Sequence, residues 1–215
     1  MITNGFDPDE ALSPHAPRDF TIVFTGVLYG AKRDIGIICK AVKELEQEKQ
    51  IENVRVVYAG PNGKLAKALA KQYDSEACMQ DLGVLPREKA LELQQNAAIL
   101  LQLNWNSKTE HCEWSGKMYE YMMMRKPIIF GVTGDEPHSF PSRNMEKLGG
   151  VCYEQCRHAE TYPDLKKYIA DKYREWKQNG RIDVQRDDSY VAQYSYRNIA
   201  EQVWEIIQDK KEGNV

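Results

Sequence analysis

The sequence predicts an α/β fold, a doubly wound parallel sheet of about six strands followed by helices at the carboxyl terminus. Two observations carry this prediction. Short apolar segments, several of them ending in glycine, alternate with segments of helical periodicity along most of the chain. The connections between them are short, which places successive strands in parallel with helices on both faces, a Rossmann-like arrangement.

The first half of the chain supplies three strands that end in glycine. We expect them at Phe20 to Gly26, Val54 to Gly60 and Ala77 to Gly83. A helix from Asp34 to Glu48 connects the first two, because apolar residues recur there on one face. Residues at helical spacing mark a second helix after the second strand: Leu65, Leu69 and Tyr73.

The second half continues the alternation. Pro86 suits the first turn of a helix that runs to about Asn96, and the apolar segment after it predicts a buried strand. Ser115 can cap the next helix. Three further strands are predicted, at Ile99 to Leu103, Pro127 to Val132 and Gly150 to Tyr153. A helix is predicted at Phe140 to Leu148, between the last two of them.

The two ends of the chain differ from this repeating pattern. Residues 1–19 are rich in proline and predict an interdomain linker, and residues 20–188 form the predicted domain. Helices are expected from Tyr162 to Lys177 and from Tyr190 to Ile207. The second, within 189–215, carries more aromatic surface than a solvated helix needs, so it packs either against a domain missing from this chain or against its own domain.

Composition limits the function. The chain has 215 residues, 29 Lys+Arg and 32 Asp+Glu, so its net charge of -3 gives no reason to expect nucleic-acid binding. Its 5 cysteines are irregularly spaced and no signal peptide is evident, which favours reduced thiols and a cytoplasmic protein. No apolar run approaches the roughly 20 residues that span a bilayer.

Several common ligand-binding motifs are absent. The segment Gly60 to Lys64 has too few residues between its glycines for a phosphate loop, and Lys117 is followed by Met118 where that motif needs Ser or Thr. No GxGxxG dinucleotide fingerprint occurs. The cysteines and histidines match no familiar zinc spacing, so we expect no metal.

A different anion site is predicted at the helix that follows Ser115. Gly116 and Lys117 lie at its amino terminus, where backbone N–H groups and the helix dipole favour an anion. Glu120 lies on the same face and could bind hydroxyl groups. Lys32 and Arg33 follow the first strand, in a loop suited to a diphosphate, although solvated surface charges are an equally simple explanation for this pair.

Five segments in this order resemble the carboxyl-terminal, donor-binding domain of GT-B-fold glycosyltransferases, most closely the retaining family-four (group 1) enzymes. They cover nearly the whole chain: ITNGFDPD, FTGVLYGAKRD, VRVVYAGP, LGVLP and SGKMYEYMMMRKPII. The first resembles the linker between the two domains of these enzymes. The last resembles the helix that carries their nucleotide-sugar contacts.

The resemblance implies roles for individual residues. Lys32 falls at the lysine that contacts the donor diphosphate, beside Gly26 of the loop and with Arg33 as a helper. Gly116 and Lys117 fall beneath the phosphates, and Glu120 falls at the glutamate that binds the ribose. The base pocket falls at three consecutive residues, Leu82, Gly83 and Val84.

Two positions depart from the family pattern. Val27 stands where the family has an arginine, which leaves Arg33 to complete the diphosphate clamp. Cys112 stands where the first glutamate of a pair is expected, so the catalytic residue is unknown, with Glu110 and Glu113 as the candidates.

The resemblance therefore implies the donor half of a hexosyltransferase that moves a sugar from a nucleotide-diphosphate sugar, UDP before GDP, to a glycan or lipid-linked acceptor. The acceptor would bind the amino-terminal domain, and the intact enzyme could be membrane-associated and make cell-surface polysaccharide. No cofactor is implied. Because Met1 coincides with the expected linker, we interpret the chain as an excised domain, inactive alone. The alternative is a non-catalytic Rossmann-like module that binds a nucleotide or docks a partner.

Overall fold

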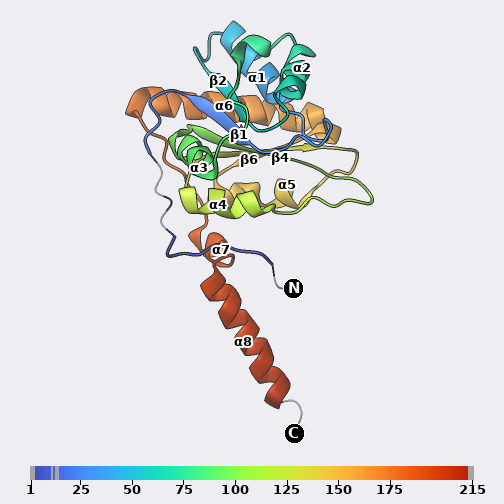
Figure 1. Ribbon diagram of the computed structural model, residues 1–215, viewed down its shortest axis with the longest axis vertical. Coiled ribbons are helices and arrows are strands. Elements are labelled where there is room, and N and C mark those ends of the chain that lie inside the picture. Colours follow the sequence, from blue (N-terminus) through green and yellow to red (C-terminus); the bar gives the residue numbers. More distant parts are fainter. Residues whose placement is uncertain (1–2, 11, 13–14, 213–215) are drawn as a thin grey trace.

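A six-stranded parallel sheet lies at the centre of the computed structural model, which describes residues 3–10, 12 and 15–212 (Figure 1). The strand order is β3-β2-β1-β4-β5-β6. The strands are β1 (Thr21–Thr25), β2 (Arg55–Ala59), β3 (Met79–Asp81), β4 (Ile99–Trp105), β5 (Ile128–Thr133) and β6 (Val151–Glu154). The predicted doubly wound fold is confirmed.

The central strand β1 pairs in parallel with both β2 and β4, with Ile22 opposite Val56 on one side and Ile99 on the other. The chain therefore builds the sheet outward from β1 to β3 and then returns to β1 to build the other half. At such a reversal the neighbouring connections leave in opposite directions and open a crevice at the carboxyl ends of the strands.

Helices cover both faces of the sheet (Figure 1). One layer contains α1 (Gly36–Gln47), α2 (Gly63–Lys71) and α6 (His158–Asn179); the other contains α3 (Arg87–Asn96), α4 (Gly116–Met124) and α5 (Phe140–Asn144). Three short 3-10 turns complete the domain: η1 (Glu76–Cys78), η2 (Met145–Leu148) and η3 (Gln155–Arg157). Alternate residues of β1 divide the core, since Ile22 and Phe24 face the first layer and Val23 faces the second.

The single helix predicted from Tyr190 to Ile207 is wrong, because two helices occupy this region, α7 (Asp188–Ala192) and α8 (Tyr196–Glu212). The amino-terminal segment interrupts them. The backbone N–H of Phe6 donates to the carbonyl of Tyr194 (3.0 Å), and that of Tyr196 donates to the carbonyl of Phe6 (2.9 Å). Apart from this bridge, the described residues before β1 form no helix or strand.

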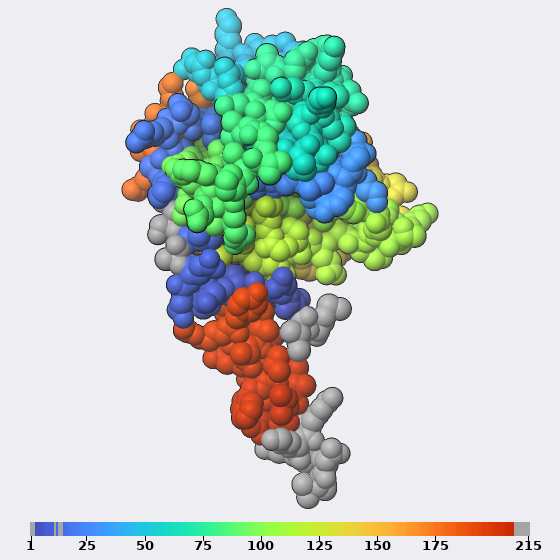
Figure 2. Space-filling view, in the orientation of Figure 1, coloured from blue at the N-terminus to red at the C-terminus, as the bar shows by residue number. Residues whose placement is uncertain are grey.

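Helix α8 points away from the body of the domain (Figures 1 and 2). Its exposed residues include four large apolar ones, Tyr196, Trp204, Ile206 and Ile207. The aromatic surface noted in the sequence is therefore divided: Tyr190 and Tyr194 are buried in the core, whereas Tyr196 and Trp204 lie in solvent. None of the described helices combines the length and apolarity needed to cross a bilayer.

The carboxyl ends of β1 and β2 meet closely because Gly60 has no side chain. A Cβ atom at Gly60 would lie 2.1 Å from the carbonyl oxygen of Gly26 and 2.4 Å from the hydroxyl of Tyr58. That hydroxyl donates to the same Gly26 carbonyl at 2.8 Å. Gly26 itself has φ +146°, a backbone conformation that favours glycine.

Lys126, just before β5, ties the amino-terminal segment to the opposite edge of the sheet. Only 4% of the residue is exposed, and its ammonium donates to the carbonyls of His15 (2.9 Å) and Ala97 (2.7 Å). No carboxylate forms an ion pair with it among the described residues. Burial lowers the pKa of Lys126 to about 8.

Substituting Gly60→Ala is expected to destabilise the protein by about 1–3 kcal/mol, because the backbone of β1 has to move away from the new methyl group. Urea denaturation measures the change. Gly116→Ala is the matched control, since a Cβ there meets no atom within 4 Å and alanine favours a helix. Equal stability of Gly60→Ala and the parent protein would contradict the close approach.

The stability of the protein should rise with pH between about 8 and 10 because of Lys126. An unfolded lysine has a pKa of about 10.4, so in this range the unfolded chain binds more protons than the folded one. The contribution is at most about 1.4 kcal/mol per pH unit. Urea denaturation at several pH values, compared with Lys126→Met, isolates it. A pH dependence that is identical in the variant would show that Lys126 is not its source.

Candidate functional site

A cavity of about 340 Å³ opens at the carboxyl ends of β1 and β2, between α3 and α4. Its base is formed by Thr25, Gly26, Ala59 and Gly60, and its walls come from α3, α4 and the loop before α3. The loop after β1 (blue), α3 (green) and α4 (yellow-green) meet on the face drawn in Figure 2. This is the crevice that the reversal of strand order predicts.

Lys117 lines the cavity at the start of α4, as the sequence suggested. No hydrogen bond or ion pair joins its ammonium to any residue that the structure describes. Burial lowers the pKa of Lys117, Glu120 acts in the opposite direction, and the positive charge of Arg33 lowers it further. A partly desolvated cation that no carboxylate contacts directly gains stability when an anion binds beside it.

Two further polar groups near this helix start are buried without a partner. Ser115 precedes α4, but its hydroxyl makes no capping bond and has no hydrogen-bond partner among the described residues. The Nε of Arg33 is likewise buried and unpartnered, while its Nη1 donates to the carbonyl of Val27 at 2.9 Å. Burial lowers the pKa of Arg33, and the aromatic ring of Tyr29 lies 4.7 Å from its guanidinium carbon.

Lys32 occupies a different environment from Arg33. Its ammonium donates to Glu110 Oε2 at 2.7 Å and lies 4.6 Å from the centre of the Trp105 ring. The indole N–H of Trp105 donates to the same carboxylate oxygen at 2.8 Å, and these contacts lower the pKa of Glu110. Lys32 and Glu110 are each half exposed and do not line the cavity.

Glu120 lines the cavity one turn beyond Lys117. Arg87, the first residue of α3, donates from Nη1 to Glu120 Oε1 at 2.9 Å. The sequence indicated that this carboxylate needs a partner but gave no sign that the partner is Arg87. Because the arginine side chain is 70% exposed, the pair lies at the mouth of the cavity, where an ion pair contributes little stability and can open.

The three residues expected to form a base pocket lie in the loop after β3. Only Val84 lines the cavity. The N–H of Leu82 donates to the carbonyl of Tyr58 at 2.9 Å, and the carbonyl of Gly83 accepts from the N–H of Gly60 at 2.8 Å. These two backbone groups therefore extend the sheet, while Leu82 and Val84 present exposed apolar side chains.

Cys112 and Glu113 have contrasting positions in the loop before α4. Cys112 is buried, which raises its pKa to about 12, and its N–H donates to Asn106 Oδ1 at 2.9 Å. Glu113 is exposed, and no hydrogen bond or ion pair joins its carboxylate to the part of the chain that the structure describes. Neither residue lines the cavity.

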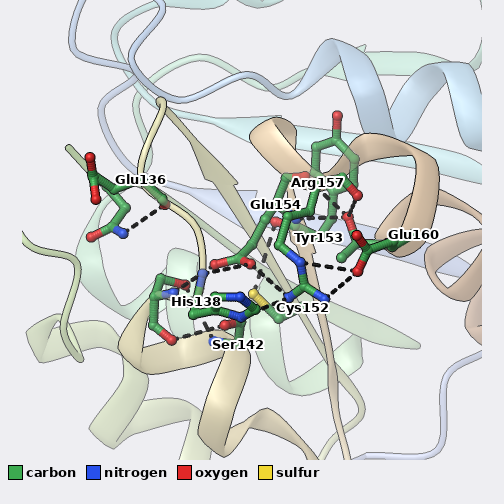
Figure 3. Close-up of polar contacts among 11 residues, drawn as sticks. Glu136, His138, Ser142, Cys152, Tyr153, Glu154, Arg157 and Glu160 are labelled. Carbon is green, nitrogen blue, oxygen red and sulfur yellow. Dashed lines mark hydrogen bonds and ion pairs between the residues drawn. The ribbon is translucent and has the colours of Figure 1, made fainter.

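A buried carboxylate fixes the neighbouring loop (Figure 3). Glu154 is fully buried and accepts from the backbone N–H groups of His138 (3.2 Å) and Ser139 (2.7 Å) and from Arg157 (3.2 Å). Although burial alone would raise its pKa, these hydrogen bonds hold the pKa of Glu154 below its ordinary value. Asn106 then links this loop to the one before α4, since its amide also donates to the carbonyl of Glu136 at 2.9 Å.

Sequence reasoning missed several residues of the cavity: Thr25, Gly60, Arg87 and Gln94. A sequence signal for Gln94 does exist. It lies three residues after Leu91 and so shares a helical face with this apolar residue, which indicates a buried position. Among the described residues, no three His, Cys, Asp or Glu side chains are grouped so that they could hold a metal ion.

Comparison with known proteins identifies the fold. No protein-family model and no curated protein matches the sequence. Solved structures do match: the lipopolysaccharide outer core galactosyltransferase WaaB in its apo form (TM-score 0.62, 14% identity), Anabaena HepE in complex with UDP and glucose (0.64, 12%), and the pneumococcal O-GlcNAc transferase GtfA in complex with UDP and GlcNAc (0.54, 15%).

The matches cover nearly all of this chain but only part of each longer protein. They include 98% of this chain and 55% of WaaB, 97% and 56% for HepE, and 97% and 38% for GtfA. The chain therefore spans about half the length, or less, of the proteins it resembles. Together with the strand order, these matches show that the chain has the fold of the carboxyl-terminal domain of GT-B glycosyltransferases.

Proposed function

We propose that this chain is the donor-binding part of a glycosyltransferase of the hexosyltransferase type, which takes a nucleotide-diphosphate sugar as its substrate. One observation carries the proposal. The Lys117 ammonium lines the cavity at the start of α4 and has no hydrogen-bond or ion-pair partner among the described residues. A diphosphate would supply acceptor oxygens to this ammonium, and the positive charge of Arg33, which already lowers the pKa of Lys117, would attract the same anion.

The diphosphate would lie over the amino terminus of α4. The first N–H groups of a helix have no partner within the helix, so those of Gly116 and Lys117 can donate to phosphate oxygens. Gly26 brings its backbone to the same cavity without a side chain. As the bond from sugar to diphosphate breaks, negative charge grows on the leaving diphosphate, and these fixed donors stabilise it.

Lys32 would join this site by exchanging partners. In the structure it binds Glu110, but both side chains are half exposed, so their ion pair stabilises the protein by less than about 1 kcal/mol. A doubly charged diphosphate is a stronger partner than a solvated carboxylate. When Lys32 leaves its ion pair to bind the diphosphate, the carboxylate of Glu110 becomes free. Glu110 and Glu113 are the candidates for the unidentified catalytic group.

The nucleoside would occupy the rest of the cavity. Glu120 would accept hydrogen bonds from the ribose hydroxyls, after Arg87 moves aside or turns to the ligand. Leu82, Gly83 and Val84 would lie against the base. UDP is preferred to GDP in this proposal because HepE and GtfA, which share the fold, were solved with UDP.

The acceptor would bind a second, amino-terminal domain, with residues 1–19 as the linker to it. Helix α8 supports this part of the proposal because its exposed face, which includes Trp204 and Ile207, has no covering segment among the described residues. We propose that the helix packs toward that domain. The acceptor is a glycan or a lipid-linked sugar of a cell-surface polysaccharide, transfer proceeds with retention, and no metal or cofactor takes part.

The same exposed face favours a second candidate function, a non-catalytic module that docks a partner protein through α8. The two candidates differ in what the cavity does. A docking module needs α8 but not Lys117 or Glu120, whereas the donor domain needs all three.

Isothermal titration calorimetry with UDP-sugars and GDP-sugars tests the donor site. Lys117→Gln and Glu120→Gln should each weaken binding of the preferred nucleotide by about tenfold or more, because each removes a charged hydrogen-bond partner worth roughly 1.5–3 kcal/mol. Lys32→Ala should weaken it less, since the lysine gives up an ion pair to bind. Controls are Lys71→Ala and Glu76→Gln, two exposed charges outside the cavity.

Unchanged affinity in both Lys117→Gln and Glu120→Gln would place the nucleotide elsewhere. Absence of binding to the parent chain at millimolar nucleotide would refute the donor-domain proposal and leave the docking module. Sugar transfer should appear only when the amino-terminal domain is supplied, on the same chain or in trans.

A further inference from the structure

An exposed aromatic pair lies at the carboxyl ends of β1 and β4. Tyr29, in the loop after β1, is 53% exposed. Its ring centre lies 5.6 Å from that of Trp105, the last residue of β4, and the two ring planes are inclined at 59°. The loops after β1 (blue) and β4 (yellow-green) lie side by side on the face drawn in Figure 2. The pair therefore stands at the same edge of the sheet as the cavity, but it does not line the cavity.

The backbone holds Tyr29 in a strained conformation. Its φ is +48°, in the left-handed region that favours glycine and that a bulky residue rarely adopts. Neighbouring hydrogen bonds fix the loop: the N–H of the buried Leu28 donates to Asn62 Oδ1 at 3.0 Å, and the N–H of Arg33 donates to the Leu28 carbonyl at 3.2 Å. Strained residues of this kind cluster at active sites and ligand sites. The strain at Tyr29 therefore indicates a role for its exposed ring.

The Tyr29 ring has one covered face and one open face. The guanidinium carbon of Arg33, whose Nε is buried, lies over the ring at 4.7 Å from its centre. Because more than half of the tyrosine is nevertheless exposed, the face opposite Arg33 is the one that meets solvent. No hydrogen bond joins the Tyr29 hydroxyl to the residues that the structure describes. The ring face, rather than the hydroxyl, is thus what this residue offers to a ligand.

A free carboxylate oxygen lies beside the aromatic pair. Glu110 uses only Oε2 for its contacts with the Lys32 ammonium (2.7 Å) and the Trp105 indole (2.8 Å). Its Oε1 has no hydrogen-bond or ion-pair partner within the described part of the chain, and its side chain is half exposed. A sugar ring fits this combination, because its C–H groups pack against aromatic carbons while its hydroxyl groups donate to acceptors. An apolar partner would instead bury the oxygen without a donor, which is unfavourable.

We propose that Tyr29, Trp105 and Glu110 form a saccharide-binding surface that receives the terminal sugar of the acceptor. The sugar ring packs on the open face of Tyr29, and its hydroxyl groups donate to Glu110 Oε1. Calling this sugar the acceptor rests on the donor-domain function proposed above. Because the surface lies outside the cavity assigned to the nucleotide, it can contact a sugar that the other domain presents. The donor domain thereby takes part in choosing the acceptor, and the acceptor is a saccharide.

NMR titration of the full chain, labelled with nitrogen-15, tests the surface without any nucleotide. The probes are the methyl glycosides of glucose, galactose, mannose and N-acetylglucosamine. Sorbitol is the negative probe, because it has hydroxyl groups but no ring face. The chain has 4 tryptophans, and the indole N–H signal that disappears in Trp105→Phe belongs to Trp105. At least one glycoside should shift this signal in the parent protein and saturate in the millimolar range, whereas sorbitol should not.

Substitutions then assign the contacts. Tyr29→Ala should weaken glycoside binding by about three- to tenfold, because it removes the stacking face. Tyr29→Phe should bind as the parent does, since it keeps the ring. Glu110→Ala should also weaken binding, because the hydroxyl groups lose their acceptor. The matched control is Tyr196→Ala on α8, which removes a tyrosine of similar exposure, 50%, outside the proposed surface. Thermal unfolding checks that each variant is folded.

Two results would overturn the saccharide surface. In one, no glycoside shifts the Trp105 signal of the parent at tens of millimolar. In the other, a folded Tyr29→Ala protein binds the glycoside as tightly as the parent. Neither result affects nucleotide binding, which calorimetry measures separately. If the parent binds a glycoside but no nucleotide, the donor-domain function fails, and with it the name acceptor, while the saccharide surface stands.

A repeat of the titration with saturating UDP, and with the UDP-sugar or GDP-sugar that binds most tightly in calorimetry, identifies the source of the sugar. A surface for the acceptor should bind the glycoside under both conditions. Loss of glycoside binding with the nucleotide sugar, but not with UDP, would assign the surface to the sugar of the donor and overturn the acceptor role.

Discussion

The parallel pairing of β1 with both β2 and β4 is the constraint on which the rest of the structure depends. It directs all six strands to end at one edge, so the loops that follow β1, β2, β3 and β4 share a small region of space. It also divides the core, because alternate residues of β1 contact different helical layers. Charges from distant parts of the sequence, such as Arg33 and Lys117, come close only because their strands end together.

The polar groups at this edge fall into two classes. Around Glu154 every buried charge is matched: the carboxylate has two backbone donors and Arg157, and Asn106 connects the same loop to the segment before α4 (Figure 3). Around the cavity several groups are unmatched. A loop is rigid when all its buried polar groups have hydrogen-bond partners, whereas donors and acceptors without partners can bind a ligand. The matched groups around Glu154 and Asn106 thus fix the segment before α4, which leads to Ser115 and Lys117.

The sequence predicted the strands and helices of the domain because periodicity and glycine-terminated strands depend on local chemistry. It failed where tertiary contacts decide. The residues around Ser195 give no sequence signal that Phe6 pairs with the chain there, and this pairing separates the predicted single helix into α7 and α8. Ser115 has the sequence of a helix cap but makes no capping bond.

Candidate residues of the site were found where they follow a strand or begin a helix, as Lys117 and Glu120 do. Arg87 and Gln94 were missed because their importance comes from what faces them across the cavity. Adjacency in sequence was misleading for Lys32 and Arg33. The first turns outward to Glu110, and the second turns inward beneath Tyr29, a difference that only the loop conformation determines.

The bridge between Phe6 and Ser195 has a consequence for how the chain folds. The sheet can assemble from contacts between neighbouring strand and helix units, which close short loops, whereas this bridge closes almost the whole chain and carries a correspondingly larger entropic cost. It should therefore form after the sheet and open before it. The two ends of the domain are therefore expected to join in a late step on which the order of the strands does not depend.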